Sequence, residues 1–206
     1  MPQAMLTRPY KLWGFVMLKI AIGAVFALAT GGVATAQETV TWNDDVQGWN
    51  VAIDRTINDS CFIISGFSNE QFVRFQFNTT QQNVQLIVAN IHWDALENGK
   101  DYDIEVAFGG LDAWSGTAKG HRWSDILPSL VLSVPMADEK ASHFMKEMTE
   151  MEALSISYDG AEIANLALTG AEEAIASMLA CQAAMSEAKK MQGTAPDPFA
   201  REESEI

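Results

Sequence analysis

The chain contains two cysteines, Cys61 and Cys181, which could form a disulfide, bind a metal or act as reactive thiols. Neither belongs to a Cys-x-x-Cys pair, and no histidine lies near either of them in sequence. Disulfides persist in oxidising compartments, and an even cysteine count in such a compartment indicates a bridge. We therefore predict a disulfide between Cys61 and Cys181, with a redox or catalytic thiol at Cys181 as the alternative.

Three methionines, Met145, Met148 and Met151, recur at intervals of three residues, and His143 precedes them. Thioethers and imidazole are ligands that Cu(I) prefers, so this run is a candidate copper site. The same spacing places the three side chains on one face of a helix, where methionine fills irregular gaps in a core. Core packing is the interpretation that we favour.

A polar segment with aromatic, cationic and titratable side chains is the best candidate for a contact site. We expect it to be a loop between two strands. These residue types would also suit a hydrolase that uses His121 with a carboxylate. However, adjacency in sequence does not establish a catalytic triad, and the sequence contains no Gly-x-Ser-x-Gly elbow. The candidate contact residues are Trp114, His121, Arg122, Trp123 and Asp125.

Three acidic residues, Asp101, Asp103 and Glu105, alternate along a predicted strand and therefore share one face. Several carboxylates together could bind Ca²⁺. However, the sequence has no Asp-x-Asp-x-Asp-Gly loop to surround an ion, and a solvated outer face explains the alternation. We interpret these residues as surface.

The N-terminal segment has the three-part pattern of a secretory signal peptide. Lys19 precedes an apolar run, and Ala34-Thr35-Ala36 forms a small-x-small cleavage signal. We predict a signal peptide over residues 1–36, with Met17 as a possible true start, and a periplasmic or secreted protein. The alternative is an uncleaved anchor, but Lys19 interrupts the apolar stretch and would be costly within a membrane.

The net charge of the chain limits the classes of molecule that it can bind. The segment 1–36 contains three basic residues and no acidic ones, so the remaining chain has 10 basic and 27 acidic residues, a net charge of −17. Such a surface excludes nucleic acid as a partner, because phosphate binding needs clusters of Lys and Arg. We expect a protein or an envelope component as partner, with a basic one favoured, and no stable membrane insertion after cleavage.

Alternating apolar residues predict short strands from Trp49 onward, with turn signals between them. A helix is predicted from about Asp138 to Glu150, and a second helix near the C-terminus. The expected fold class is α+β: a mainly antiparallel sheet, curled or in two layers, with two helices, the C-terminal one packed on the sheet. We predict one domain over residues 37–191 and a disordered acidic tail over residues 192–206.

Local signals support these elements. Asp159-Gly160 between two apolar runs predicts a tight hairpin. Thr169 and Glu172 have the spacing of a capping box at the start of the last helix. Cys181 shares a helical face with Ala174, Met178 and Met185, and this face should pack against the sheet.

The sequence as a whole favours an exported, disulfide-stapled acidic domain that binds another molecule without catalysis and without a cofactor. A hydrolase using His121 and a copper-handling protein using the methionine run are the two alternatives.

Overall fold

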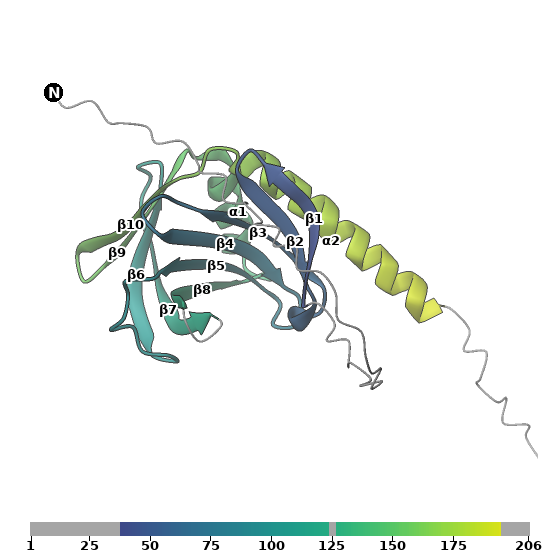
Figure 1. Ribbon diagram of the computed structural model, residues 1–206, viewed down its shortest axis with the longest axis horizontal. Helices are drawn as coiled ribbons and strands as arrows, with labels where there is room; N and C mark the ends of the chain where they lie inside the picture. The colour runs from purple at the N-terminus through teal and green to yellow at the C-terminus, as the bar shows by residue number, and fades with distance from the viewer. Residues whose placement is uncertain (1–37, 124–126, 195–206) are drawn as a thin grey trace, which may run out of the picture.

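The computed structural model describes residues 38–123 and 127–194 (Figure 1). The predicted signal peptide, the alternative start at Met17 and Asp125 lie outside the described residues, as does the predicted tail beyond Thr194. The last helix extends to Thr194, three residues past the predicted end of the domain.

The described residues form ten β-strands, two α-helices and one 3-10 turn at Arg55–Ile57. The helices are α1 (Glu139–Glu150) and α2 (Ala171–Thr194). The strands are β1 (Thr39–Val46), β2 (Trp49–Asp54), β3 (Ser60–Gly66), β4 (Gln71–Asn78), β5 (Asn83–Asn90), β6 (Asp101–Phe108), β7 (Trp114–Trp123), β8 (Leu127–Pro135), β9 (Ala153–Tyr158) and β10 (Ala161–Ala167).

All ten strands belong to one antiparallel sheet, in the order β1-β2-β3-β4-β5-β8-β7-β6-β9-β10. In Figure 1, β4, β5 and β8 run across the view while β6 runs from top to bottom, so the sheet is strongly curved. The curvature brings β10 back toward the first strands. The Gln71 Nε2 atom donates to the Ile163 carbonyl oxygen at 2.9 Å, and Trp49 Nε1 donates to the Thr169 carbonyl oxygen at 3.0 Å. The predicted α+β class and the curled form of the sheet are confirmed.

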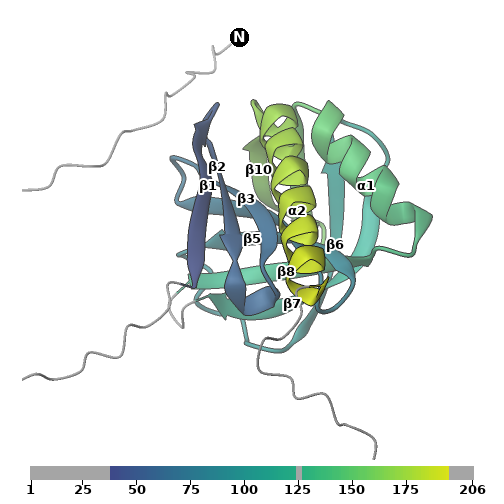
Figure 2. The same cartoon turned by 90° about the vertical axis from the view of Figure 1, so that its right-hand side faces the viewer.

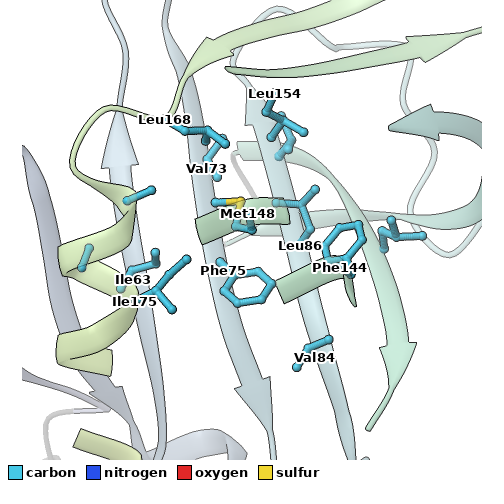
Figure 3. Packing of buried hydrophobic residues seen from close by; sticks show 14 of the residues in the cluster. Ile63, Val73, Phe75, Val84, Leu86, Phe144, Met148, Leu154, Leu168 and Ile175 are labelled. Atoms are coloured by element: carbon cyan, nitrogen blue, oxygen red, sulfur yellow. The ribbon is translucent and has the colours of Figure 1, made fainter. Parts of the chain in front are cut away.

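Alternation along each strand separates the sheet into two faces. On β4, Val73, Phe75 and Phe77 enter the core, while Arg74 and Gln76 lie on the opposite face. The core face is covered by the helices: α2 packs on β1, β2 and β3, and α1 packs on β8 and α2 (Figure 2). Figure 3 shows Phe144 and Met148 of α1 among side chains from the sheet and Ile175 of α2.

The predicted disulfide is present and joins β3 to α2. Cys61 and Cys181 are both fully buried, and their Cα atoms are 6.1 Å apart. The backbone N–H of Cys61 also donates to the Gln182 side-chain oxygen at 2.9 Å. The predicted core face of α2 is confirmed, since Ala174, Met178 and Cys181 are buried and Met185 packs against the core.

Two further local predictions have different outcomes. Asp159 and Gly160 both have positive φ and connect β9 to β10, so the hairpin is confirmed. The capping box is wrong, because α2 begins after Gly170, whose carbonyl accepts from Ala174 N. Gly170 has φ +80°, and a Cβ there would lie 2.5 Å from the Gln47 Cβ. Close contact with the β1–β2 turn therefore requires glycine directly before the helix, one residue after the predicted cap Thr169.

The sequence patterns missed two strands, β1 and β7. Register shifts in the pairing with β2 interrupt the alternation of β1 at Asn43 and Val46. After Trp114, the next core-facing positions of β7 are Gly116, Ala118 and Gly120, which carry little or no apolar signal. A Cβ at Gly120 would lie 2.3 Å from the Glu97 carbonyl oxygen, so the segment before β6 occupies the space of a side chain. Trp114, His121, Arg122 and Trp123 of the expected loop therefore belong to an interior strand of the sheet.

Candidate functional site: a polar trough on the open face of the sheet

A hollow of about 1710 Å³ lies on the face of the sheet opposite the helices; we call it the trough. Its floor is formed by β2, β3, β4, β5 and β8, and its sides by β1 and β7. The apolar part of the lining includes Phe62, Ile64, Ile87, Val131 and Trp123. Because these side chains alternate with core residues along their strands, the backbone pairing of the sheet fixes their direction.

Arg74 lines the trough on β4 and is 5% exposed. One of its guanidinium nitrogens donates to Asp54 Oδ2 at 2.5 Å. The guanidinium carbon is 3.7 Å from the centre of the Phe62 ring and 5.1 Å from that of Trp123. A cation over an aromatic face is attracted by the ring electrons, and the attraction grows when water is excluded. The ion pair and the two rings therefore hold the guanidinium in one orientation.

Burial and hydrogen bonding act in opposite directions on this pair. Burial would raise the pKa of Asp54, but hydrogen bonds from Thr56 and Arg74, together with the Arg74 charge, outweigh it and lower that pKa. Burial lowers the pKa of Arg74, and the bond and charge of Asp54 partly restore it. Asp54 is thus kept ionised, and its charge compensates the buried cation.

A chain of side-chain hydrogen bonds runs along the floor from β4 to β8. Gln76 Nε2 donates to Gln85 Oε1, and Gln85 Nε2 donates to Ser133 Oγ at 3.1 Å. Asn78 Nδ2 also approaches Gln85 Oε1, at 3.5 Å. Gln85 Oε1 accepts and Gln85 Nε2 donates within this chain. Gln76 must therefore point its side-chain nitrogen at Gln85, and this leaves Gln76 Oε1 outside the chain of hydrogen bonds.

Two polar atoms in the trough lining are buried and have no hydrogen-bond partner: Arg74 Nε and Gln76 Oε1. Both atoms belong to β4, in residues two positions apart on one face of the strand. Leaving a buried donor or acceptor unpaired costs about 1–3 kcal/mol. Such groups in a native fold call for a water or a ligand as partner.

The residues predicted as a contact loop are divided between the two faces of β7. His121 and Trp123 line the trough. Trp114 instead donates from Nε1 to Glu147 Oε2 on α1, and its ring lies 5.6 Å from that of Phe144. Arg122 donates to the carbonyls of Asp94 and Leu96 and so fixes the segment before β6. Of the four predicted residues that the structure describes, only His121 and Trp123 lie together in the trough.

The catalytic interpretation of His121 receives no support from its surroundings. Across the described ranges, no hydrogen bond or ion pair joins the His121 ring to a carboxylate. Asp54, an acidic side chain that lines the trough, is already bonded to Arg74 and Thr56. A general base needs an orienting partner and a substrate proton within reach.

The methionine run packs against the core. Met148 is fully buried, and Met145 and Met151 are partly buried against the same cluster. Met151 lies just past the end of α1, with its sulfur close to Gly109. Their positions account for all three residues as packing residues, in agreement with the interpretation that we favoured.

The acidic face of β6 is exposed and partly paired. Lys119 Nζ contacts Asp101 at 2.6 Å, and Thr117 Oγ1 donates to Asp103 at 2.9 Å. Within the part of the chain that the structure describes, no three His, Cys, Asp or Glu side chains are grouped to hold a metal ion.

The sequence patterns missed these polar residues of the trough lining: Asp54, Arg74, Gln76 and Gln85. Arg74 and Gln76 alternate with apolar residues along β4, a pattern typical of a solvated strand face, yet both are buried. One signal was available: Gln85 interrupts the apolar run Val84–Ala89 in a strand with neighbours on both sides. Polar residues on adjacent interior strands, paired as Gln76 is with Gln85, indicate a buried polar face.

The fold and the trough together define a single-sheet α+β domain with a preformed polar hollow. Known protein families, curated proteins and solved structures give no match to this chain. A search of the helices in the described ranges found none that is long and apolar enough to cross a membrane.

Proposed function

We propose that this chain is an exported binding domain and that the trough is its ligand site. The observation that carries the proposal is the buried Arg74–Asp54 pair beside the unpartnered Gln76 Oε1 atom. A buried ion pair is costly to desolvate, and apolar side chains would often fill the same space with equal or better stability. A binding role explains why the open face of the sheet carries a fixed cation and an amide network.

Two further features support the exported setting. The disulfide is fully buried and joins the last helix to the sheet, and structural disulfides of this kind belong to oxidising compartments. The signal pattern over residues 1–36 predicts a mature chain that begins at Gln37. Intact mass of the protein recovered from the exported fraction should match residues 37–206. Membrane-bound material that retains Met1 or Met17 would contradict this.

The binding proposal is tested by blocking the trough. Thr41 is an exposed trough-wall residue on β1, so Thr41→Trp places a large ring over the hollow. Thr117→Trp on β7 is the matched control, because Thr117 is an exposed strand threonine outside the trough. The ¹⁵N-labelled protein would be titrated with protein, glycan, lipid and small-molecule fractions of the extracellular and envelope material.

The expected result is that at least one fraction shifts amide signals of β3, β4 and β5. The shifts should persist in Thr117→Trp and disappear in Thr41→Trp. Shifts confined to other parts of the molecule, or no shifts with any fraction, would contradict the trough as the ligand site.

A further inference from the structure

The two unpartnered atoms in the trough require opposite kinds of partner. Arg74 Nε carries a hydrogen and needs an acceptor, whereas Gln76 Oε1 needs a donor. A carboxylate or phosphate could accept from Arg74 but has no hydrogen to give to Gln76. An ammonium group has the reverse deficiency. Neutral groups that both donate and accept, such as the hydroxyls of one ligand, can supply a partner for each atom.

The charges around the trough also disfavour an anionic ligand. The positive charge of Arg74 is compensated by Asp54. Glu38, just before β1, and Asp44 and Asp45 on β1 add negative charge, while Lys119 is on the β7 side. The whole chain has a net charge of −14. Charges of one sign that line a cleft repel ligands of the same sign, so phosphate-rich and uronic acid ligands are disfavoured.

The lining combines the two kinds of surface that a sugar ring presents. Phe62, Ile64 and Val131 offer apolar surface for the C–H face of a ring, and Trp123 adds an aromatic side chain. Gln76 Oε1, which the amide chain leaves unpaired, and the exposed Ser133 hydroxyl at the end of that chain offer polar contacts for ring hydroxyls. The hollow of about 1710 Å³ exceeds the 300–1,000 Å³ of ordinary small-molecule sites, so the ligand spans several rings.

An extended peptide also carries neutral donors and acceptors, but it uses them differently. Peptides that add to a sheet pair their backbone with an open strand edge. The two unpartnered atoms here are side-chain atoms of β4, which has β3 and β5 as neighbours on its two sides. The polar contacts therefore lie on the face of an interior strand and not at an edge.

From these observations we infer that the trough binds a neutral, hydroxyl-rich oligosaccharide of several rings, whose hydroxyls supply the partners that Arg74 Nε and Gln76 Oε1 lack. This inference rests on the proposed function, because it names the ligand of the same trough.

The test uses the disulfide-bonded protein. A glycan array with neutral, uronic acid and amino-sugar oligosaccharides is followed by calorimetric titration of the tetrasaccharides maltotetraose, cellotetraose, chitotetraose, tetragalacturonate and deacetylated chitotetraose. Extended peptides from a random library serve as competitors. Amide shifts locate each bound compound on the structure.

The expected result is binding of a neutral oligosaccharide with shifts in β3, β4 and β5, and no comparable binding of the charged ones. Gln76→Leu, which removes the free acceptor, should weaken binding at least tenfold. The matched control Asn165→Leu changes an exposed amide on β10 and should leave the affinity unchanged. Thermal unfolding of both variants checks that they are folded. If Gln76→Leu does not fold, the map of amide shifts in the unmodified protein still tests the site.

Several results would overturn the inference: no neutral glycan bound, preference for a charged oligosaccharide, or displacement of the glycan by peptides. Preference for a peptide or a charged compound in the trough would leave the binding site standing and refute only the ligand class. If no compound shifts the trough amides, the proposed function fails as well.

Discussion

Asp54 and Arg74 are more strongly coupled than any other charged pair in the described residues, because both side chains are almost excluded from water, with exposures of 12% and 6%. The remaining ion pairs each have at least one partner on the surface. Exposed pairs contribute about 0–1 kcal/mol, whereas breaking a buried pair costs about 3–5 kcal/mol. Single substitutions at this pair should therefore have large effects.

Asp54→Asn should destabilise the protein by about 3 kcal/mol, because it leaves Arg74 as a buried cation without a counter-charge. Arg74→Met should cost less, since Asp54 keeps hydrogen bonds from the backbone and hydroxyl of Thr56. The double variant should be more stable than the sum of the two losses predicts. Denaturant unfolding of the unmodified protein and the three variants measures the four free energies of unfolding. A larger loss of stability for Arg74→Met than for Asp54→Asn would refute the view that Arg74 depends on Asp54 for its counter-charge.

The same pair predicts a pH dependence. Folding lowers the pKa of Asp54, so its stabilisation is fully present above the unfolded carboxyl value of about 3.9 and is lost as the pH falls through the lower folded value. Below about pH 4, the unmodified protein should therefore lose stability more steeply than Asp54→Asn. Melting temperatures measured against pH test this. Asp103→Asn, an exposed β6 carboxylate, is the control and should keep the steep slope.

At the scale of elements, α2 is held to the sheet by a narrow apolar face and by the disulfide. Ile175 and Met178 are its two large, fully buried apolar residues, and Ala171 and Ala174 add little apolar area. At its C-terminal end, Lys189 contacts Asn58 and Asp59 in the β2–β3 connection. The covalent bond therefore carries more of the attachment than it would in a leucine-rich helix.

Replacing both cysteines by serine should reduce stability by about 4–5 kcal/mol, the chain-entropy value for a loop of this length. The two cysteines are 120 residues apart. Amide exchange should increase first in α2 and later in β4 and β5. Because both cysteines are fully buried, thiols must be counted in denaturant: none without reductant, two with it. Free thiols in the unreduced, unfolded protein would show that the bridge is absent.

Gly170 provides a second test at this scale, because it combines positive φ with a close contact. Gly170→Ala adds a Cβ that meets Gln47 at 2.5 Å and should cost about 1–3 kcal/mol more than backbone strain alone. Gly99→Ala is matched in φ, at +81°, with nothing within 4 Å of the added Cβ. Equal losses of stability in the two variants would mean that the contact with the β1–β2 turn is unimportant.

The elements that could be predicted from sequence were those with an uninterrupted period. The helix predicted from about Asp138 is confirmed as α1, with Asp138 as its N-cap, and the β9–β10 hairpin follows from Asp159-Gly160. β7 was missed because glycines face the core, and the trough residues were missed because polar residues on strands usually indicate solvent. Which face of β4 meets water depends on how the whole sheet curves, and local sequence does not carry that information.

For the whole molecule, the curvature of the sheet explains both the core and the trough. Strands far apart in the sheet meet on the helix-covered side, where β2 and β4 contact the β10 region. On the other side, Trp123 of β7 reaches Arg74 of β4 across β5 and β8. One curved sheet thus encloses a hydrophobic core on one face and a polar hollow on the other.

The excess of negative charge predicts how this molecule responds to salt. Residues 37–206 have a net charge of −17, and mutual repulsion of like charges destabilises a compact state. Salt shortens the screening distance from about 30 Å at 0.01 M to about 10 Å at 0.1 M, so it should relieve this repulsion. Salt also weakens exposed ion pairs, such as Lys119–Asp101, but each contributes only about 0–1 kcal/mol.

Relief of the charge repulsion should therefore outweigh the weakening of ion pairs. The melting temperature of residues 37–206 should rise between about 0.01 and about 0.2 M NaCl, the range in which the screening distance changes most. Binding of a neutral oligosaccharide should be insensitive to the same change, because no counterions are released, whereas a basic protein partner would bind more weakly as salt increases. Calorimetry at the two salt concentrations measures both quantities. If the melting temperature falls with salt, the surface ion pairs contribute more to stability than the net charge removes. If the affinity for the trough ligand falls steeply with salt, the ligand is charged and not neutral.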